Sequence, residues 1–362
     1  MRRIYPDYYE KFTCIADKCP QTCCAGWEIE IDEAALKKYR ELKIETVDFK
    51  HECFKQDKEK RCKNLDERGL CKLILLHGEE ILCNTCRLFP RHIEEFENVR
   101  EYSLSISCPE VARYLLNRKE PVTYRTVEDD VVDTEEYDQQ EQLIYKKLLI
   151  LRQVFFETVI DRTFSFAEKA GRILSIARKF QLQADDILVS GGDVDSIDEE
   201  IAKAADYKPL EITSDQRYEI FKVMKTWEYT GDEIIEVLKM TEKALYKESV
   251  SDEEALEEKM CNYLFGQGMD WDILTEQILH YFLYIYFCGS AYDEYYYGQA
   301  QLAVAAYLHI KDFAMAHFKI HGAISTEDVI YLTYLYAREL EHSVPNILAT
   351  ERYMDEHPIM MD

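Results

Sequence analysis

The spacing of apolar and polar positions divides this chain of 362 residues into two parts. After residue 137, apolar residues return every three or four positions, which is the pattern of helices that bury one face. The stretch 326–342 is the clearest case, because Ser325 can cap a helix whose first turn holds Glu327 and Asp328. The pattern predicts helices over 137–160, 164–181, 195–205, 214–227, 231–247, 252–265, 270–288, 293–319 and 326–342.

Before residue 120 the pattern is short and mixed. Alternation from Trp27 to Asp32 predicts a strand, and the apolar residues on both sides of 77–80 predict a hairpin. Further expected elements are a helix over 33–42, a chain reversal over 96–99, a helix start at Cys108-Pro109 and a short strand over 123–127.

The fold class that follows is mainly α. We predict a small irregular α+β cysteine-rich, metal-binding domain over 1–120, an acidic linker over 121–136 and an all-helical domain over 137–362. Charge follows the same division. Residues 1–120 hold 22 Lys and Arg against 23 Asp and Glu, so the rest of the chain, with 22 against 47, carries nearly all of the net charge of −26.

The acidic part of the chain bears on possible partners. A surface of this charge repels nucleic acid and anionic membranes and attracts basic, lysine-bearing proteins. The simpler interpretation is a solvated acidic surface with no steering role. No nucleic-acid or membrane partner is therefore expected.

Cysteine is concentrated at the start of the chain, where ten of the twelve lie within the first 108 residues. Nine of the ten belong to the clustered set Cys14, Cys19, Cys23, Cys24, Cys62, Cys71, Cys83, Cys86 and Cys108. Cysteine at this density indicates either disulfides or a metal. The start of the chain lacks the apolar core of a signal peptide, and no long apolar stretch follows, so we expect a reducing cytoplasmic location and a metal.

The spacing leaves the identity of the metal open. Cys83-x-x-Cys86 allows one turn to present two thiolates, whereas the other spacings are looser. Nine thiols exceed one tetrahedral zinc site and would satisfy a four-cysteine iron–sulfur cluster with spares, or two sites. His77 and His92 could complete a site, but surface or turn positions are the favoured interpretation for both. Adjacent Cys23 and Cys24 should point to opposite faces if the chain is extended there.

The cysteine segments resemble the flagellin lysine N-methylase family, which belongs to a wider set of clustered-cysteine zinc- or iron-chelating domains. The resemblance runs through Phe12-x-Cys14-x4-Cys19-x3-Cys23-Cys24-x-Gly26-Trp27, Arg61-Cys62 to Leu70-Cys71, Gly78 to His92 and Ser107-Cys108-Pro109-Glu110. A shorter similarity covers Ala337-Arg338-Glu339-Leu340-Glu341-His342-Ser343. Together these segments bracket nearly the whole chain.

The resemblance implies methyl transfer from S-adenosylmethionine to lysine side chains of flagellin, with a four-iron iron–sulfur (4Fe-4S) cluster. Two features depart from familiar cofactor sites. Gly26 stands where a third cysteine of a C-x3-C-x2-C motif would fall, and no strand followed by G-x-G-x-x-G is present. An ordinary doubly wound methyltransferase domain is therefore not expected, and the sequence does not choose between radical and polar transfer.

Candidate roles can be assigned to few residues. The preferred metal ligands are Cys19, Cys23, Cys62, Cys71, Cys83 and Cys86, with Cys14, Cys24 and Cys108 as second choices. Arg87, Arg91 and His92 are candidates for the cofactor carboxylate or for supporting the metal ligands. No general base can be named.

Three alternatives remain open at the level of sequence. The tyrosines crowded between Tyr281 and Tyr297 could form an aromatic cage for a methylated ammonium, or could simply pack. Glu339-x-x-His342 matches a di-iron helix motif, but no partner copy is found outside the terminal tail. The rival function is a non-catalytic scaffold in which zinc stabilises the N-terminal domain and the helices carry an interaction surface.

Overall fold

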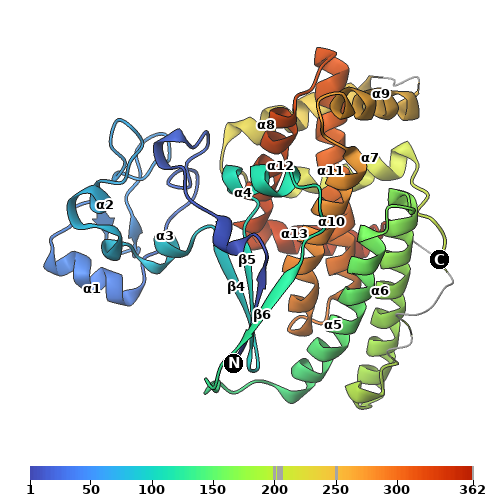
Figure 1. Ribbon diagram of the computed structural model, residues 1–362, viewed down its shortest axis with the longest axis horizontal. Coiled ribbons are helices and arrows are strands. Elements are labelled where there is room, and N and C mark those ends of the chain that lie inside the picture. The colour runs from blue at the N-terminus through green and yellow to red at the C-terminus, as the bar shows by residue number, and fades with distance from the viewer. Residues whose placement is uncertain (199–200, 202–206, 249–251, 361–362) are drawn as a thin grey trace.

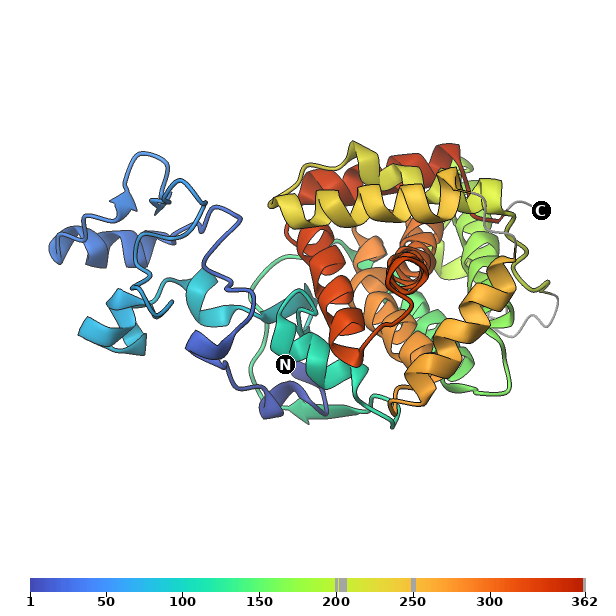
Figure 2. The same ribbon diagram turned by 90° about the horizontal axis from the view of Figure 1, so that it is seen from above.

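The chain forms a cysteine-rich lobe beside a larger helical body (Figure 1). The computed structural model describes residues 1–198, 201, 207–248 and 252–360, and is mainly helical. The lobe comprises residues 12–90, and the body comprises the described residues of the ranges 1–11 and 91–360. Seen from above, the lobe projects away from the stacked helices (Figure 2). Among the described helices, none combines the length and apolar character that a bilayer crossing requires.

Loops dominate the lobe, and its regular elements are short. They are α1 (Glu33–Glu41), β2 (Val47–Asp48), β3 (Cys53–Phe54), α2 (Lys72–His77) and α3 (Asn84–Leu88). Asp32 caps α1 by accepting a hydrogen bond from the backbone N–H of Ala35 at 3.0 Å. A small separate core forms around Leu36, Tyr39 and Phe54, which are almost fully buried.

A four-stranded sheet forms the side of the body that lies next to the lobe (Figure 1). Its strands are β1 (Arg2–Pro6), β4 (Arg91–Phe96), β5 (Val99–Leu104) and β6 (Tyr124–Glu128), in the order β4-β5-β1-β6. β1 runs parallel to β5 and antiparallel to β6, whereas β4 and β5 form a hairpin. The hairpin turns at Asn98, whose φ of 54° lies in the left-handed region that asparagine tolerates.

The body is a stack of helices around α11. The helices are α4 (Pro109–Leu116), α5 (Gln139–Ile160), α6 (Phe166–Val189), α7 (Ser214–Lys222), α8 (Asp232–Thr241), α9 (Glu253–Phe265), α10 (Trp271–Tyr286), α11 (Tyr296–His321), α12 (Thr326–Glu341) and α13 (Val344–Glu356). From Gly298 to Ala316 every residue of α11 is buried, which is typical of a helix surrounded on all sides. Ser325 and Asp328 form the capping box that starts α12.

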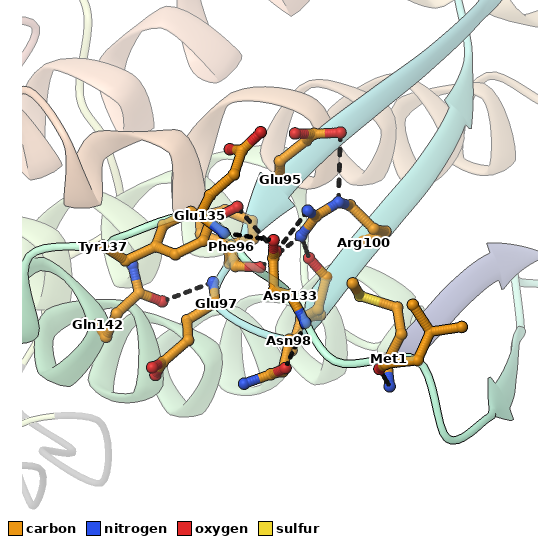
Figure 3. A network of polar contacts seen from close by, with 12 residues as sticks. Met1, Glu95, Phe96, Glu97, Asn98, Arg100, Asp133, Glu135, Tyr137 and Gln142 are labelled. Atoms are coloured by element: carbon orange, nitrogen blue, oxygen red, sulfur yellow. Dashed lines mark hydrogen bonds and ion pairs between the residues drawn. The ribbon is translucent and has the colours of Figure 1, made fainter.

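The acidic segment after β6 is held against the sheet rather than left free (Figure 3). Asp133 accepts a hydrogen bond of 2.5 Å from Arg100 and a second, of 3.0 Å, from the hydroxyl of Tyr137. The guanidinium of Arg100 keeps the pKa of Asp133 below its usual range. The proposed division of the chain at residues 120 and 137 stays a prediction, although the sheet and α4 share the core of the body.

Most helix predictions for the body are confirmed, and two predictions for the lobe are wrong. The expected hairpin around Gly78 is instead α2 followed by the 3-10 helix Glu79–Ile81, because Gly78 (φ 81°) ends the helix. The segment Trp27–Asp32 makes only one isolated bridge, from Glu30 to Cys53, although Ile29 and Ile31 are buried as alternation requires. Helix α13 was not expected, and the helix expected over 195–205 falls largely outside the described residues.

Candidate functional site

A cavity of about 800 Å³ lies where the lobe meets the body. The lobe contributes six of its cysteines, together with Trp27, Phe89 and Arg87. The body contributes Arg91, Cys108, Arg338 and His342. The cysteines that line the cavity are Cys14, Cys19, Cys23, Cys24, Cys71, Cys86 and Cys108, whereas Cys62 and Cys83 are buried behind them.

The loop between Cys62 and Cys71 is folded tightly by one carboxylate. Asp66 accepts hydrogen bonds of 2.9 Å from the backbone N–H groups of Arg68 and Leu70, and Gly69 adopts a φ of 79°. The bonds from these N–H groups lower the pKa of Asp66. This turn folds back the eight residues between Cys62 and Cys71 and so brings Cys71 towards Cys62.

The Cys83–Cys86 turn is positioned by Asp32 of the preceding segment. One carboxylate oxygen of Asp32 caps α1, and the other accepts a hydrogen bond of 2.7 Å from the backbone N–H of Asn84. Cys86 hydrogen-bonds Cys83 and lowers the pKa of the Cys83 thiol to about 7, while the pKa of Cys86 rises. Sequence reasoning missed this role for Asp32, since its only local signal was that of a helix cap.

The chain is not extended at Cys23 and Cys24, so the condition for their pointing to opposite faces is not met. The chain turns at these residues, and Thr22 accepts a hydrogen bond of 3.1 Å from the backbone N–H of Cys24. The two thiols are hydrogen-bonded to each other, which lowers the pKa of Cys24 to about 7 and raises that of Cys23. Cys23 also interacts with Cys14 and Cys108.

The nine clustered thiols form a continuous band. Burial raises the pKa of Cys62 to about 11, and the nearby charges of Cys24 and Cys71 add to this rise. Burial likewise raises the pKa of Cys108, with Cys19 and Cys14 as neighbours. All twelve cysteines lie in the described part of the chain, and there none forms a disulfide. Within that part, no three Cys, His, Asp or Glu side chains already converge as a metal ion would require.

Three cysteines lie outside the band, as the sequence predicted. Cys53 and Cys288 are buried, and Cys261 is partly buried against the body core. The chemistry of the site therefore rests on the nine clustered thiols, whose donor type suits an iron–sulfur cluster or zinc.

Arg338 connects the body to the lobe. Its Nη2 donates a hydrogen bond of 3.0 Å to the carbonyl of Ala25, and its guanidinium lies 4.3 Å above the ring of Trp27. Its Nη1 is buried without a hydrogen-bond partner in the described structure. A Cβ atom at Gly26 would lie 3.3 Å from Nη2, and the φ of Gly26 is +97°, so glycine suits this position better than the missing third cysteine.

The predicted cofactor-binding residues are divided by the structure. Arg87 and Arg91 line the cavity, and Arg91 lies over the rings of Tyr9 and Phe12 at 5.7 and 5.4 Å. His92 instead points to the surface, where it contacts Glu94 at 3.1 Å. His77 is also exposed at the end of α2. Their assignment to a cofactor stays a prediction.

The other two sequence alternatives can be compared with the structure. Glu339 bonds Thr230, with its two oxygens accepting at 2.6 Å and 2.7 Å, and so positions a loop. The tyrosines between Tyr281 and Tyr297 pack and donate to separate partners, as with Tyr284 to the carbonyl of Tyr102 at 3.0 Å. Sequence reasoning missed the hydrogen-bonded chain of Ser105, Ser107 and Glu341. The two serines lie about 235 positions before the helix end that they contact.

More than half of the chain matches a known protein family. Residues 152–360 match the family model described as the FliB lysine N-methylase C-terminal domain. The Lysine-N-methylase of Salmonella typhimurium strain LT2 is 31% identical over 127 residues, which covers 31% of this chain and 32% of that protein. The Flagellar biosynthetic protein FliU of Salmonella muenchen is 30% identical over 127 residues, or 31% of this chain and 75% of that protein.

The similarity to the curated relatives has a limited extent. The chain aligns with about a third of the length of the two curated lysine-N-methylases, the second of which comes from Salmonella choleraesuis. No solved structure matches the chain. The family model spans both Arg338 and His342, which form the body's side of the cavity.

Proposed function

Because the chain belongs to the FliB lysine N-methylase family, we propose that it transfers methyl groups from S-adenosylmethionine to lysine side chains of flagellin in the cytoplasm. The observation that carries the proposal is the cavity between the lobe and the body. One wall bears clustered thiols, and the other bears Arg338 and His342 from the part of the chain that matches the family.

An iron–sulfur cluster, of the 4Fe-4S type, is proposed as the resident metal group. The four ligands of the cluster would come from the nine clustered thiols. Thiols suit this role because cysteine thiolates are the usual ligands of iron–sulfur clusters. When bound, the cluster supplies a redox centre next to the cavity. Arg87 and Arg91 would bind the carboxylate of S-adenosylmethionine, since both guanidiniums lie on the cavity wall.

The wall around Arg338 favours a neutral lysine amine. An ammonium group that enters beside this buried guanidinium meets a like charge, and the rings of Trp27 and Phe89 exclude part of its water. Both effects lower the pKa of a lysine below its usual value of about 10.4. A neutral amine is required for attack on a methyl carbon in a polar transfer.

The charge of the body supports a basic protein substrate. Nearly all of the net charge of −26 lies after residue 120, so the helical surface attracts lysine-rich segments over the range of a Debye length. The proposal therefore predicts that methyl transfer to flagellin slows as ionic strength rises.

The test is methyl transfer from isotopically labelled S-adenosylmethionine to purified flagellin under anaerobic, reducing conditions. We expect label on lysine ε-amines and none on flagellin whose lysines have been acetylated. Absence of transfer from a chain that contains its full complement of iron would overturn the proposal. A colourless chain with stoichiometric zinc and no transfer would favour the scaffold function instead.

A matched pair of variants tests the proposed cluster separately. Cys71→Ser removes a thiol from the cavity wall and should lower the iron content, the brown colour and methyl transfer together. Cys53→Ser removes a buried thiol of the same lobe that lies outside the cavity, and it should keep all three. Equal iron content in the two variants would contradict the assignment of Cys71 to the metal centre.

A further inference from the structure

We propose that His342, Ser107, Ser105 and Glu341 form a proton relay that removes the proton from the substrate lysine in the cavity. The proposal rests on the proposed function and supplies the base that the sequence does not reveal. In this scheme His342 meets the lysine, whereas the two serines and Glu341 act through it.

The relay is a continuous chain of hydrogen bonds. His342 Nε2 and Ser107 Oγ are 2.8 Å apart, and Ser107 Oγ lies 2.5 Å from Ser105 Oγ. Ser105 Oγ in turn donates to Glu341 Oε2 at 2.5 Å. Each link is within the range in which a proton passes between hydrogen-bonded oxygen or nitrogen atoms.

The acceptor end of the relay is fixed from two further sides. Tyr281 of α10 donates to Glu341 Oε1 at 2.9 Å and accepts a hydrogen bond of 2.8 Å from the backbone N–H of Ile106. The backbone N–H of Ser107 also donates to Ser105 Oγ at 3.2 Å. The short segment 105–107 is thereby held against the end of α12 and the middle of α10.

The donor end of the relay opens into the cavity. His342 is the residue after α12, and solvent reaches its ring even though the ring is recessed among aromatic neighbours. Trp27 lies 4.4 Å and Phe89 lies 5.6 Å from it, measured between ring centroids. Since Nε2 is engaged by Ser107, the second ring nitrogen, Nδ1, is available to the substrate amine.

The surroundings of the relay set the protonation states of its two ends, His342 and Glu341. Partial desolvation by its neighbours, together with the positive charge of Arg338, lowers the pKa of His342 to about 4, so the ring is neutral and passes a proton on. Burial raises the pKa of Glu341 to about 7, against the opposing effects of Ser105, Tyr281 and His92. Tyr8, Tyr286 and Tyr336 also face Glu341, and all three remain neutral because burial raises their pKa values further.

The proton transfer is balanced. Nδ1 of His342 takes a proton from the lysine ammonium while Nε2–H gives its proton to Ser107 Oγ. Ser107 passes its own proton to Ser105, and Ser105 passes its proton to the carboxylate of Glu341. The lysine becomes a neutral amine, Glu341 becomes a neutral acid, and the histidine is neutral before and after, with its tautomer exchanged.

The pH profile of methyl transfer tests the relay. In the wild-type chain kcat should rise with pH up to about 7, where Glu341 ionises, and then level off. In Glu341→Gln, kcat at pH 7 should fall about 100-fold, which is the usual scale of general base catalysis. In this variant kcat should also keep rising about tenfold per pH unit up to pH 9, since only the free amine fraction of the lysine then limits it.

Other variants separate the relay from a purely structural network. Ser107→Ala should give the same continuous rise with pH as Glu341→Gln, whereas Tyr281→Phe should keep the plateau and move its onset to higher pH. Glu339→Gln is the matched control, because Glu339 is a buried carboxyl of the same helix that bonds Thr230 outside the relay. Its profile should keep the wild-type shape even if the variant is less stable.

Each outcome of this experiment decides between distinct claims. A wild-type plateau that survives in both Glu341→Gln and Ser107→Ala would overturn the relay while leaving the methylase function intact. A kcat of Glu341→Gln that is lower by the same factor at every pH would also overturn the relay, because this result would show that Glu341 has a structural role. Absence of methyl transfer by the iron-loaded wild-type chain would overturn the proposed function, and the relay with it.

Discussion

The lobe and the body differ in how they are stabilised. The body buries long apolar helices around α11 and holds the ion pair of Arg152 with Glu101 inside a large core. The lobe buries only a small group of residues around Leu36, Tyr39 and Phe54, and thiols make up much of the rest of its interior. A core this small gives limited stability, so bound metal is expected to supply part of the folding free energy of the lobe. The body, in contrast, can hold the end of α12 in place unaided.

The largest expected effect tests the body. Glu101 accepts hydrogen bonds of 2.5 and 2.7 Å from Arg152, and both side chains are buried. Glu101→Gln leaves the guanidinium without its counter-charge, so we expect the free energy of unfolding to fall by about 3–5 kcal/mol. Chemical denaturation measures this loss, and Glu95→Gln on the exposed side of the same sheet serves as control with a change of less than about 1 kcal/mol. Equal losses in the two variants would remove the distinction between buried and exposed pairs.

The next effect tests whether the lobe has a core of its own. Leu36 is 2% exposed in the small core, and Leu36→Ala should cost about 2–5 kcal/mol there. We expect faster amide hydrogen exchange in α1 and in the loops of 29–83, with unchanged protection in α10 and α11. A matched Leu279→Ala in α10 should produce the reverse pattern. Loss of protection across the whole chain in Leu36→Ala would show that the two regions unfold as one unit.

The last effect, spread over a range of pH, concerns a buried histidine of the body. Burial lowers the pKa of His309 to about 4, and the ring contacts the hydroxyl of Tyr336 at 3.2 Å. Between pH 6.5 and 4 the unfolded chain binds a proton at this residue that the folded chain does not bind. The stability that neutral His309 provides is therefore present above pH 6.5 and is lost by about 1.4 kcal/mol per pH unit as the pH falls.

A difference measurement isolates this effect from the other titrating groups. The free energy of unfolding of the wild-type chain minus that of His309→Gln should shrink as the pH falls from 6.5 to 4. The difference is needed because Glu341 and Glu351, whose pKa values are raised to about 7, act in the opposite direction over the same range. A difference that stays constant with pH would show that His309 is protonated in the folded chain.

The same contrast explains what the sequence could predict. Apolar periodicity located α5, α8 and α12 closely, and α5 and α12 also start at polar caps, Asp138 and Ser325. In the lobe, turns around cysteines have no such period, so α2 resembled a hairpin and the turn at Cys23 was missed. The thiols could be named from their density alone.

The body's side of the cavity could not be derived from local pattern. Ser105 meets Glu341 across 236 positions, and Arg338 meets Ala25 across 313, and such contacts depend on the packing of the whole body. Only the similarity of the segment 337–343 to a known family pointed to that helix end. The polar residues of this helix end make three different contacts. Arg338 bonds the lobe, Glu339 holds the loop at Thr230, and Glu341 accepts a hydrogen bond from Ser105.

The central claim is that the lobe and the body form one site in which lysine is methylated. The most direct measurement is mass-spectrometric mapping of methyl groups on flagellin after reaction with the wild-type chain, with Cys71→Ser and with Arg338→Gln. The account predicts methylated lysines with the wild-type chain and none above background with either variant, while circular dichroism shows the body still folded in both. Methylation that persists when either wall is altered would contradict a shared site.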